Sequence, residues 1–302
     1  MPAEAYYETA YLAMRGRLRH KEPMSAHTSW RVGGPADTFF MPADIEDLSE
    51  YLAQLDSSED LHWVGLGSNL LVRDAGIRGT VISVTGVLND ISLYEDGIET
   101  GAGLSCARAA RFSAQNQLGG AEFLAGIPGT IGGALAMNAG AFGSEIWDIV
   151  SEVSTIDRRG EIHQRDKGEF KIGYRSVEKP EGEYFVSAKL KLNKDREQLA
   201  RTNIKELLSK RAQSQPIGEH SCGSVFRNPE GDHAARLIEA CGLKGHSIGG
   251  ASVSKKHANF IINSGTASAA DIESLIGFVQ KQVSDKFAIQ LQTEVCIIGE
   301  GN

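Results

Sequence analysis

The 302 residues carry 31 Lys and Arg against 39 Asp and Glu, a formal net charge of −8 with neutral histidines. This acidic balance excludes a general electrostatic attraction to nucleic acid or to an anionic membrane surface, so any bound phosphate must be held by local groups. The length is sufficient for two or three domains that each have a core.

The first ten residues, MPAEAYYETA, lack the basic start and apolar core of a signal peptide, and no stretch is suited to span a membrane. Four cysteines, Cys106, Cys222, Cys241 and Cys296, form no CxxC pair, and the eight histidines do not cluster at metal-ligand spacing. We therefore expect a cytoplasmic protein with reduced thiols, no membrane contact and no metal.

The chain begins with what we expect to be a short helical leader before His27. A turn at residues 33–35 precedes an expected strand at 36–41, and a helix is expected at 44–55. A strand at 61–64 then leads into Gly65-Leu66-Gly67-Ser68-Asn69. This polar loop can present backbone amides and a hydroxyl to a phosphate, although it lacks the third glycine and the amphipathic helix of a Rossmann fingerprint.

The sequence GAGLSCA at 101–107 also has a GxG start. Ser105 is a suitable cap for a helix that runs to about Leu118, where Gly119 and Gly120 follow. No acidic residue suited to bind a ribose lies about 20 positions on, so we interpret this helix as one that packs on a sheet.

A glycine-rich run, AGIPGTIGGALAMNAGAFG, spans residues 125–143 and has six glycines from Gly126 onward. Glycine permits positive φ and close approach, so the run can turn its N–H groups inward as a seat for a diphosphate. Taken alone, it is equally typical of a buried helix of small residues at 134–137.

Beyond Val150 the pattern predicts strands at 152–157, 161–164 and 184–192, the last with Val186, Ala188, Leu190 and Leu192 on one face. The charged stretch 193–197 is the best candidate for a domain boundary.

Helices are expected at about 197–213 and 232–241, and a strand at 259–263. Ser268 and Asp271 form a capping box for a helix whose apolar stripe continues to Val283. A last strand is expected at 288–298, with Glu294 on the face opposite to its apolar residues.

Three groups of residues are candidates for chemistry: Arg175 in GYRS, Ser224 in SCGSVFRNP, and Glu294. Each also has an ordinary interpretation, as a surface arginine, a structural turn or a solvent-facing edge residue. Cys222 has no histidine in a recognisable partner pattern, and we interpret His257 as structural or adjacent to substrate. The residues by themselves do not identify a reaction.

Together, however, the motifs resemble one family, the flavin-dependent UDP-N-acetylenolpyruvoylglucosamine reductases of peptidoglycan synthesis (MurB). The resemblance runs from about Thr28 to the end and rests on eight motifs in the family's order: TSWRVGG, GLGSNLLV, the glycine-rich run, YRSV, CGSVFRNP, LIEACGLKG, SKKHANFIIN and LQTEV. It implies an α+β fold with a two-lobed FAD-binding module of the vanillyl-alcohol-oxidase type at 1–194 (lobes about 1–85 and 86–194) and a substrate-binding α/β domain at 195–302.

The resemblance implies non-covalent FAD, NADPH as hydride donor and a UDP-sugar substrate, with no obligate protein partner evident. The expected FAD contacts are Gly65, Gly67, Ser68, Asn69, Gly126, Ile127, Pro128, Gly129, Gly132, Asn138, Ala139 and Gly140. Arg175 matches the family's charge-stabilising arginine, Ser224 its proton donor and Glu294 its acidic partner. Tyr174 and Asn228 are expected to place the substrate, and Arg211, Lys244 and Lys255 are weaker candidates for its diphosphate.

One departure concerns a loop whose tyrosine closes over the substrate in some members of the family. Only about ten residues separate Arg175 from Tyr184, so the chain resembles the shorter branch that lacks this insertion. Two alternatives stay open: an alcohol or sugar oxidase of the same fold, and a flavin- or nucleotide-binding protein without turnover.

Overall fold

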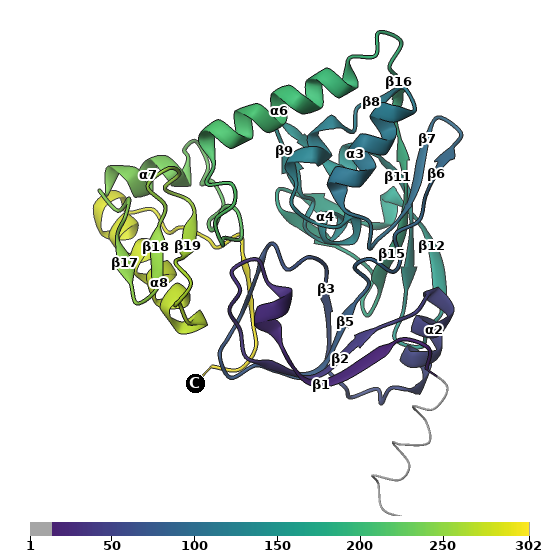
Figure 1. Cartoon of the computed structure of the whole chain (residues 1–302), viewed down its shortest axis with the longest axis horizontal. Coiled ribbons are helices and arrows are strands. Elements are labelled where there is room, and N and C mark those ends of the chain that lie inside the picture. The colour runs from purple at the N-terminus through teal and green to yellow at the C-terminus, as the bar shows by residue number, and fades with distance from the viewer. Residues whose placement is uncertain (1–13, 302) are drawn as a thin grey trace, which may run out of the picture. The chain divides into compact units, whose positions relative to one another are not determined.

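The computed structural model describes residues 14–301 and divides into two compact units (Figure 1). The N-terminal unit comprises the described part of Met1–His20 with Thr38–Gly65 and Gly79–Leu207. The C-terminal unit comprises Lys21–Asp37, Leu66–Arg78 and the described part of Leu208–Asn302. Each unit is thus built from separated segments, whereas the functional division expected at residue 195 is linear and stays a prediction.

The expected helical leader is wrong from Arg17 onward. Strand β1 (Arg17–Pro23) and the 3-10 helix η2 (Met24–His27) occupy this stretch, and residues 1–13 lie outside the described part. Pairing of β1 at the edge of a sheet overrides the local helical preference, and Pro23 cannot occupy a helix interior.

A four-stranded sheet has the order β1-β2-β5-β3, with β2 at Pro35–Met41, β5 at Ile77–Ser83 and β3 at Leu61–Val64. Helix α2 (Ile45–Gln54) begins after Asp44, whose carboxylate accepts a hydrogen bond from the Asp47 N–H at 2.9 Å. The strands and the helix predicted here are confirmed. Phe40, Leu48 and Ile82 lie in one buried cluster, which is the core of this layer.

A five-stranded antiparallel sheet of order β12-β11-β15-β7-β6 forms the second layer of the N-terminal unit. Its strands are β6 (Ile91–Tyr94), β7 (Gly97–Gly101), β11 (Val150–Ile156), β12 (Ile162–Asp166) and β15 (Tyr184–Lys191). Helices α3 (Cys106–Gln115) and α4 (Ile131–Met137) pack on this sheet (Figure 1). Helix α3 is capped by Ser105 as predicted but ends three residues before Leu118.

Short elements connect these layers. The strand pairs are β8 (Leu118–Gly119) with β16 (Asn193–Lys194), β9 (Gly140–Ala141) with β10 (Ser144–Glu145), and β13 (Lys171–Gly173) with β14 (Ser176–Glu178). The short helices are η3 (Glu122–Gly126), α5 (Ile146–Ile149) and η4 (Lys167–Glu169). The longer helix α6 (Ala200–Ser214) contains the last boundary between the two units.

The C-terminal unit contains a three-stranded sheet of β17 (Ser247–Ile248), β18 (Ala251–Val253) and β19 (Ile261–Asn263), with helices α7 (Ala234–Ala240) and α8 (Ala269–Phe287). The capping box of α8 is confirmed, because Ser268 and Asp271 exchange hydrogen bonds of 3.0 Å. The predicted stripe of α8 is buried.

The expected strand at 288–298 is wrong in extent. Only β20 (Cys296–Ile298) is regular, and it pairs in parallel with β4 (Leu70–Val72). The Val225 carbonyl accepts both the Glu294 and the Val295 N–H, at 2.8 and 3.4 Å, which interrupts the alternation of a regular ladder. Among residues 14–301, no helix is both long and apolar enough to cross a membrane.

Candidate active site

The glycine-rich run forms the end of η3, a loop, helix α4 and the turn into β9. Three backbone hydrogen bonds attach it to the segment at 102–106: Cys106 N–H to Gly129, Ile131 N–H to Leu104, and Gly132 N–H to Ala102, at 2.8–2.9 Å. The GAGLS sequence is therefore a support for the run, in keeping with the expectation that it is not a dinucleotide site.

Close packing explains two of the glycines. A Cβ on Gly132 would lie 2.9 Å from Ala102 Cβ, and one on Gly65 would lie 2.6 Å from Thr130 Oγ1. The second contact brings the start of the GLGSN loop against the glycine-rich run within the N-terminal unit. In the described chain, the backbone N–H groups of Gly129 and Thr130 meet no protein acceptor. Amides gathered in this way fit a diphosphate such as that of FAD.

The remainder of the GLGSN loop lies in the C-terminal unit. Gly67 has a φ of +62°, and its carbonyl accepts the Ser29 N–H at 3.0 Å. The Asn69 side chain donates to the Glu294 carbonyl at 3.0 Å, and the Asn69 carbonyl accepts the Cys296 N–H at 3.0 Å. The predicted cofactor loop is thus attached to the segment that carries a predicted catalytic residue.

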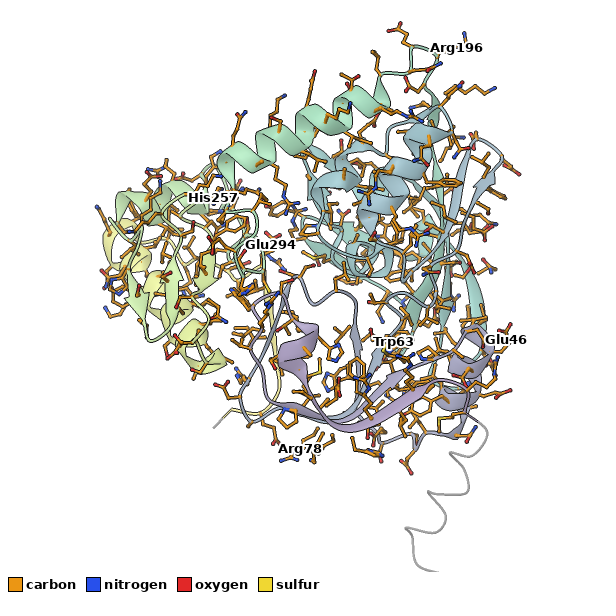
Figure 2. The ribbon with its side chains drawn as sticks, viewed as in Figure 1. Glu46, Trp63, Arg78, Arg196, His257 and Glu294 are labelled. Atoms are coloured by element: carbon orange, nitrogen blue, oxygen red, sulfur yellow. The ribbon has the colours of Figure 1, made fainter. Side chains whose placement is uncertain are left out.

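Glu294, which is labelled in Figure 2, lies in the same unit as Ser224. Val225, the residue after Ser224, accepts the Glu294 N–H at 2.8 Å through its carbonyl. The Val225 N–H donates to the Asn259 carbonyl at 2.9 Å, and the Asn259 side chain binds both the N–H and the carbonyl of Phe226 at 3.0 and 2.8 Å. The backbone that carries Ser224 is therefore held on both sides.

Arg175 lies in the N-terminal unit, at the second position of the two-residue turn between β13 and β14. Its φ is +53°, a conformation more usual for glycine. The guanidinium donates to the carbonyls of Asn138 at 3.2 Å and Gly140 at 3.1 Å, at the end of the glycine-rich run. The half-exposed Tyr174 ring lies 5.1 Å from the Arg175 Cζ.

Glu145 is a residue of this site that the sequence analysis missed. Its carboxylate lies 3.5 Å from Arg175 Nη1 and accepts a 2.6 Å hydrogen bond from the Asn138 side chain. No local pattern connects Glu145 with Arg175, because they are 30 positions apart. The only sequence signal is an acidic residue two positions after the end of the uncharged glycine-rich run.

Two asparagines predicted to bind ligands have structural partners. The Asn138 amide also donates to the Gly173 carbonyl at 3.0 Å, and its Oδ1 accepts the Trp147 N–H at 3.4 Å. Asn228 Oδ1 accepts the Ala234 N–H at 3.1 Å, at the start of α7. Their expected contacts with FAD and substrate stay predictions, and the side chains have these further roles.

Among the weaker candidates for the substrate diphosphate, Lys244 pairs with Glu239 at 2.7 Å, and the stem of Lys255 packs on Gly245. Burial lowers the pKa of Arg211, which donates to the Gln215 side chain at 2.9 Å. Among the residues that the structure describes, no hydrogen bond joins these three side chains to one another.

Burial lowers the pKa of His257, which precedes β19 and is labelled in Figure 2. Burial also raises the pKa of the Cys222 thiol to about 12. Cys222 Sγ lies 3.5 Å from the carbonyls of Gly67 and Leu70. A protonated thiol beneath the GLGSN loop is no nucleophile at neutral pH, which agrees with the sequence interpretation.

One cluster in the described chain has ligand atoms close enough for a metal: Asp157, Glu161 and His163, all within 4.8 Å. The guanidinium of Arg159 pairs with both carboxylates of this cluster, at 3.3 and 3.1 Å. The positive charge of Arg159 therefore accounts for the close approach of the two carboxylates, and no bound cation is needed to explain it.

Comparison with known proteins matches residues 36–165 to the model of an FAD binding domain. Residues 215–298 match the C-terminal domain of UDP-N-acetylenolpyruvoylglucosamine reductase. Together, these matches and the mixed strands and helices confirm the predicted α+β fold with an FAD-binding module and a C-terminal domain.

Two proteins called UDP-N-acetylenolpyruvoylglucosamine reductase are similar over nearly the whole length. That of Methylococcus capsulatus is 54% identical over 287 residues, and that of Legionella pneumophila strain Corby is 55% identical over 290 residues; each alignment covers 95% of this chain and 94% of the relative. The crystal structure of the Thermus caldophilus reductase (MurB) is similar with a TM-score of 0.80 and 31% identity, and covers 94% of this chain and 99% of that one. The chain therefore belongs to the family of UDP-N-acetylenolpyruvoylglucosamine reductases.

Proposed function

We propose that the protein is an FAD-dependent oxidoreductase that uses NADPH to reduce UDP-N-acetylglucosamine enolpyruvate to UDP-N-acetylmuramate, a step of peptidoglycan precursor synthesis. The observation that carries this proposal is similarity to reductases of this name along 95% of the chain. The presence of Arg175, Ser224 and Glu294 at the positions of the family's motifs supports the same reaction.

The residues expected to hold FAD fit its diphosphate. Within residues 14–301 the amides of Gly129 and Thr130 have no competing protein acceptor, and close packing at Gly65 and Gly132 excludes a side chain at either position. The phosphates would be held by backbone N–H groups, as suits a chain with a net charge of −8. FAD, when bound, supplies the hydride that it receives from NADPH.

Arg175 is proposed to face the carboxylate of the enolpyruvyl group. When a hydride adds to the terminal carbon of that group, negative charge develops on the α-carbon and is delocalised into the carboxylate. A guanidinium held in advance by the carbonyls of Asn138 and Gly140 stabilises this charge without reorganisation.

Ser224 is proposed to give the proton that completes the reaction at the α-carbon. A hydroxyl is a weak acid, so this step requires a very basic carbanion and groups that stabilise the alkoxide left behind. Glu294 is proposed to take part in stabilising the intermediate or in the proton balance, since its backbone is bonded to the residue next to Ser224.

The finer assignments complete the proposal. Residues 1–194 would bind FAD and residues 195–302 the UDP-sugar, with Tyr174 and Asn228 as substrate contacts. The protein would act in the cytoplasm without nucleic acid, membrane or an obligate protein partner. The short connection of eight residues between Arg175 and Tyr184 supports the shorter branch of the family.

An anaerobic experiment tests the function. The purified holoenzyme is reduced with NADPH, UDP-N-acetylglucosamine enolpyruvate is added, and the flavin absorbance is followed. We expect rapid return of oxidised flavin together with the lactyl ether product. Reduced flavin that is not reoxidised by this substrate but is rapidly reoxidised by oxygen would contradict the proposal and favour an oxidase.

A further inference from the structure

The guanidinium of Arg175 is held by partners that lie outside its own hairpin. We call this set of partners the socket. The residue has a φ of +53°, an unfavourable conformation for any residue with a Cβ, and its side chain is only 15% exposed. A partly buried guanidinium needs partners that compensate its lost hydration. Two of these are the carbonyls of Asn138 and Gly140, and a third, charged partner in the N-terminal unit is Glu145.

Glu145 acts on this socket in two ways. One carboxylate oxygen lies 3.5 Å from Arg175 Nη1, a long contact that contributes mainly through charge. The other accepts a 2.6 Å hydrogen bond from Asn138 Nδ2, and the carbonyl of the same asparagine binds Arg175. Glu145 therefore holds both the arginine and the residue that binds it.

The surroundings of Glu145 keep the carboxylate in place. Its own N–H donates to the Asp148 carboxylate at 2.8 Å, at the start of α5. Asn138 is almost fully buried, has a φ of +47°, and binds β13 through Gly173 and α5 through Trp147. The Asn138 side chain thus connects Glu145, β13 and α5, so the geometry around Arg175 is well defined.

We infer that Glu145 is a positioning residue, which keeps the Arg175 guanidinium in the orientation needed to stabilise the charge that develops on the substrate carboxylate. This inference rests on the proposed function. Glu145 touches neither substrate nor reacting atoms in this role, because it acts through Arg175 and Asn138.

The substitution Glu145→Gln separates this role from a structural one. The glutamine carbonyl can still accept the hydrogen bond from Asn138, whereas its amide would turn a donor toward the donor Nη1 of Arg175. We expect the rate of flavin reoxidation by UDP-N-acetylglucosamine enolpyruvate to fall by about 10-fold to 100-fold. The rate of flavin reduction by NADPH should change by less than about twofold, because Arg175 is needed only where charge develops on the substrate.

One control matches this variant. Glu169→Gln removes the carboxylate that pairs with Arg165 at 2.9 Å, away from the socket. It should lower the melting temperature at most, with the ratio of the two half-reaction rates unchanged.

The experiment uses stopped-flow absorbance of each holoenzyme in both half-reactions. A double variant adds a second measurement: in the Arg175→Lys background, Glu145→Gln should have little further effect, since the group that it positions is gone. An unchanged reoxidation rate in Glu145→Gln, equal losses in both half-reactions, loss of FAD, or full additivity with Arg175→Lys would each overturn the inference. If the wild-type flavin is not reoxidised by this substrate, the proposed function itself fails, and the inference fails with it.

Discussion

Single residues in this site combine an unusual backbone with a defined set of partners. Arg175 occupies a turn position where a left-handed conformation costs a non-glycine residue roughly 1–2 kcal/mol. Such strain persists only where the surrounding structure compensates it, and it is concentrated at functional positions. Ser224 follows Gly223, which has a φ of +71°, and precedes Val225, whose N–H and carbonyl are both bonded. These two of the three predicted catalytic side chains are thus presented by tight, well-anchored turns.

The proton-donor role predicts a selective effect of Ser224→Ala. Flavin reduction by NADPH should proceed at nearly the wild-type rate, whereas product formation from the enolpyruvyl substrate should fall by about 100-fold to 10,000-fold, the usual contribution of a positioned acid. Rapid mixing with quantification of the product measures both. Ser221→Ala, in the same turn, is the matched control, and equal losses in the two half-reactions of Ser224→Ala would contradict the role.

At the scale of elements, helix α8 follows the sequence pattern closely. Its capping box, its apolar stripe and its left-handed end at Ala288 are local features, and the stripe is buried against α7 and the small sheet. Gly277 is the one weak position in this helix interior. It is exposed, and a Cβ there would meet no atom within 4 Å.

We therefore expect Gly277→Ala to raise the free energy of unfolding by about 0.5–1 kcal/mol, because alanine loses less backbone entropy on forming a helix. Thermal melting at a fixed FAD concentration measures the shift. Gly97→Ala is the opposite case, since its Cβ would collide with the Leu190 carbonyl across the β7–β15 ladder. A lower melting temperature for Gly277→Ala would show that the added methyl group collides with a neighbouring atom, against the open space found there.

At the scale of the whole molecule, the excess of acidic groups is compensated by ion pairs and caps that lower carboxyl pKa values. Lys21 lowers the pKa of Asp37, Arg73 lowers that of Glu273, and the backbone N–H of Ser268 lowers that of Asp271. Burial opposes ionisation of Glu183, but hydrogen bonds from Arg165 and Thr155 lower its pKa overall. A carboxyl with a lowered pKa in the folded state stabilises the protein above its unfolded pKa, and this contribution is lost as the pH falls through the folded value.

Glu183→Gln should consequently reduce stability more at pH 7 than in acid. The difference in melting temperature between wild type and variant should shrink as the pH falls below about 4.3, the ordinary glutamate pKa, because the carboxyl of the unfolded wild type then takes up a proton, and that of the folded protein follows at lower pH. Calorimetry at several pH values tests this. Glu178→Gln is the control, since Glu178 pairs with Lys171 in solvent and such pairs contribute little. A constant difference across the pH range would refute the assignment.

Much of this protein could be predicted from the sequence, because the relevant information is local. Strand β3, helix α2 after Asp44 and helix α8 after Ser268 depend on residues a few positions apart, which supply caps and one apolar face. The eight ordered motifs likewise identified the family, whereas the catalytic roles of Arg175, Ser224 and Glu294 stay predictions.

Only the tertiary structure showed which residues support the candidate site residues. Glu145 meets Arg175 across 30 positions, and Asn69 meets Glu294 across 225. The early segments Lys21–Asp37 and Leu66–Arg78 belong to the C-terminal unit, and the chain near Glu294 bends where Val225 accepts two N–H groups. Local patterns specify caps and faces, whereas these pairings form only when distant segments fold onto one another, and their energy comes from contacts that no sequence window contains.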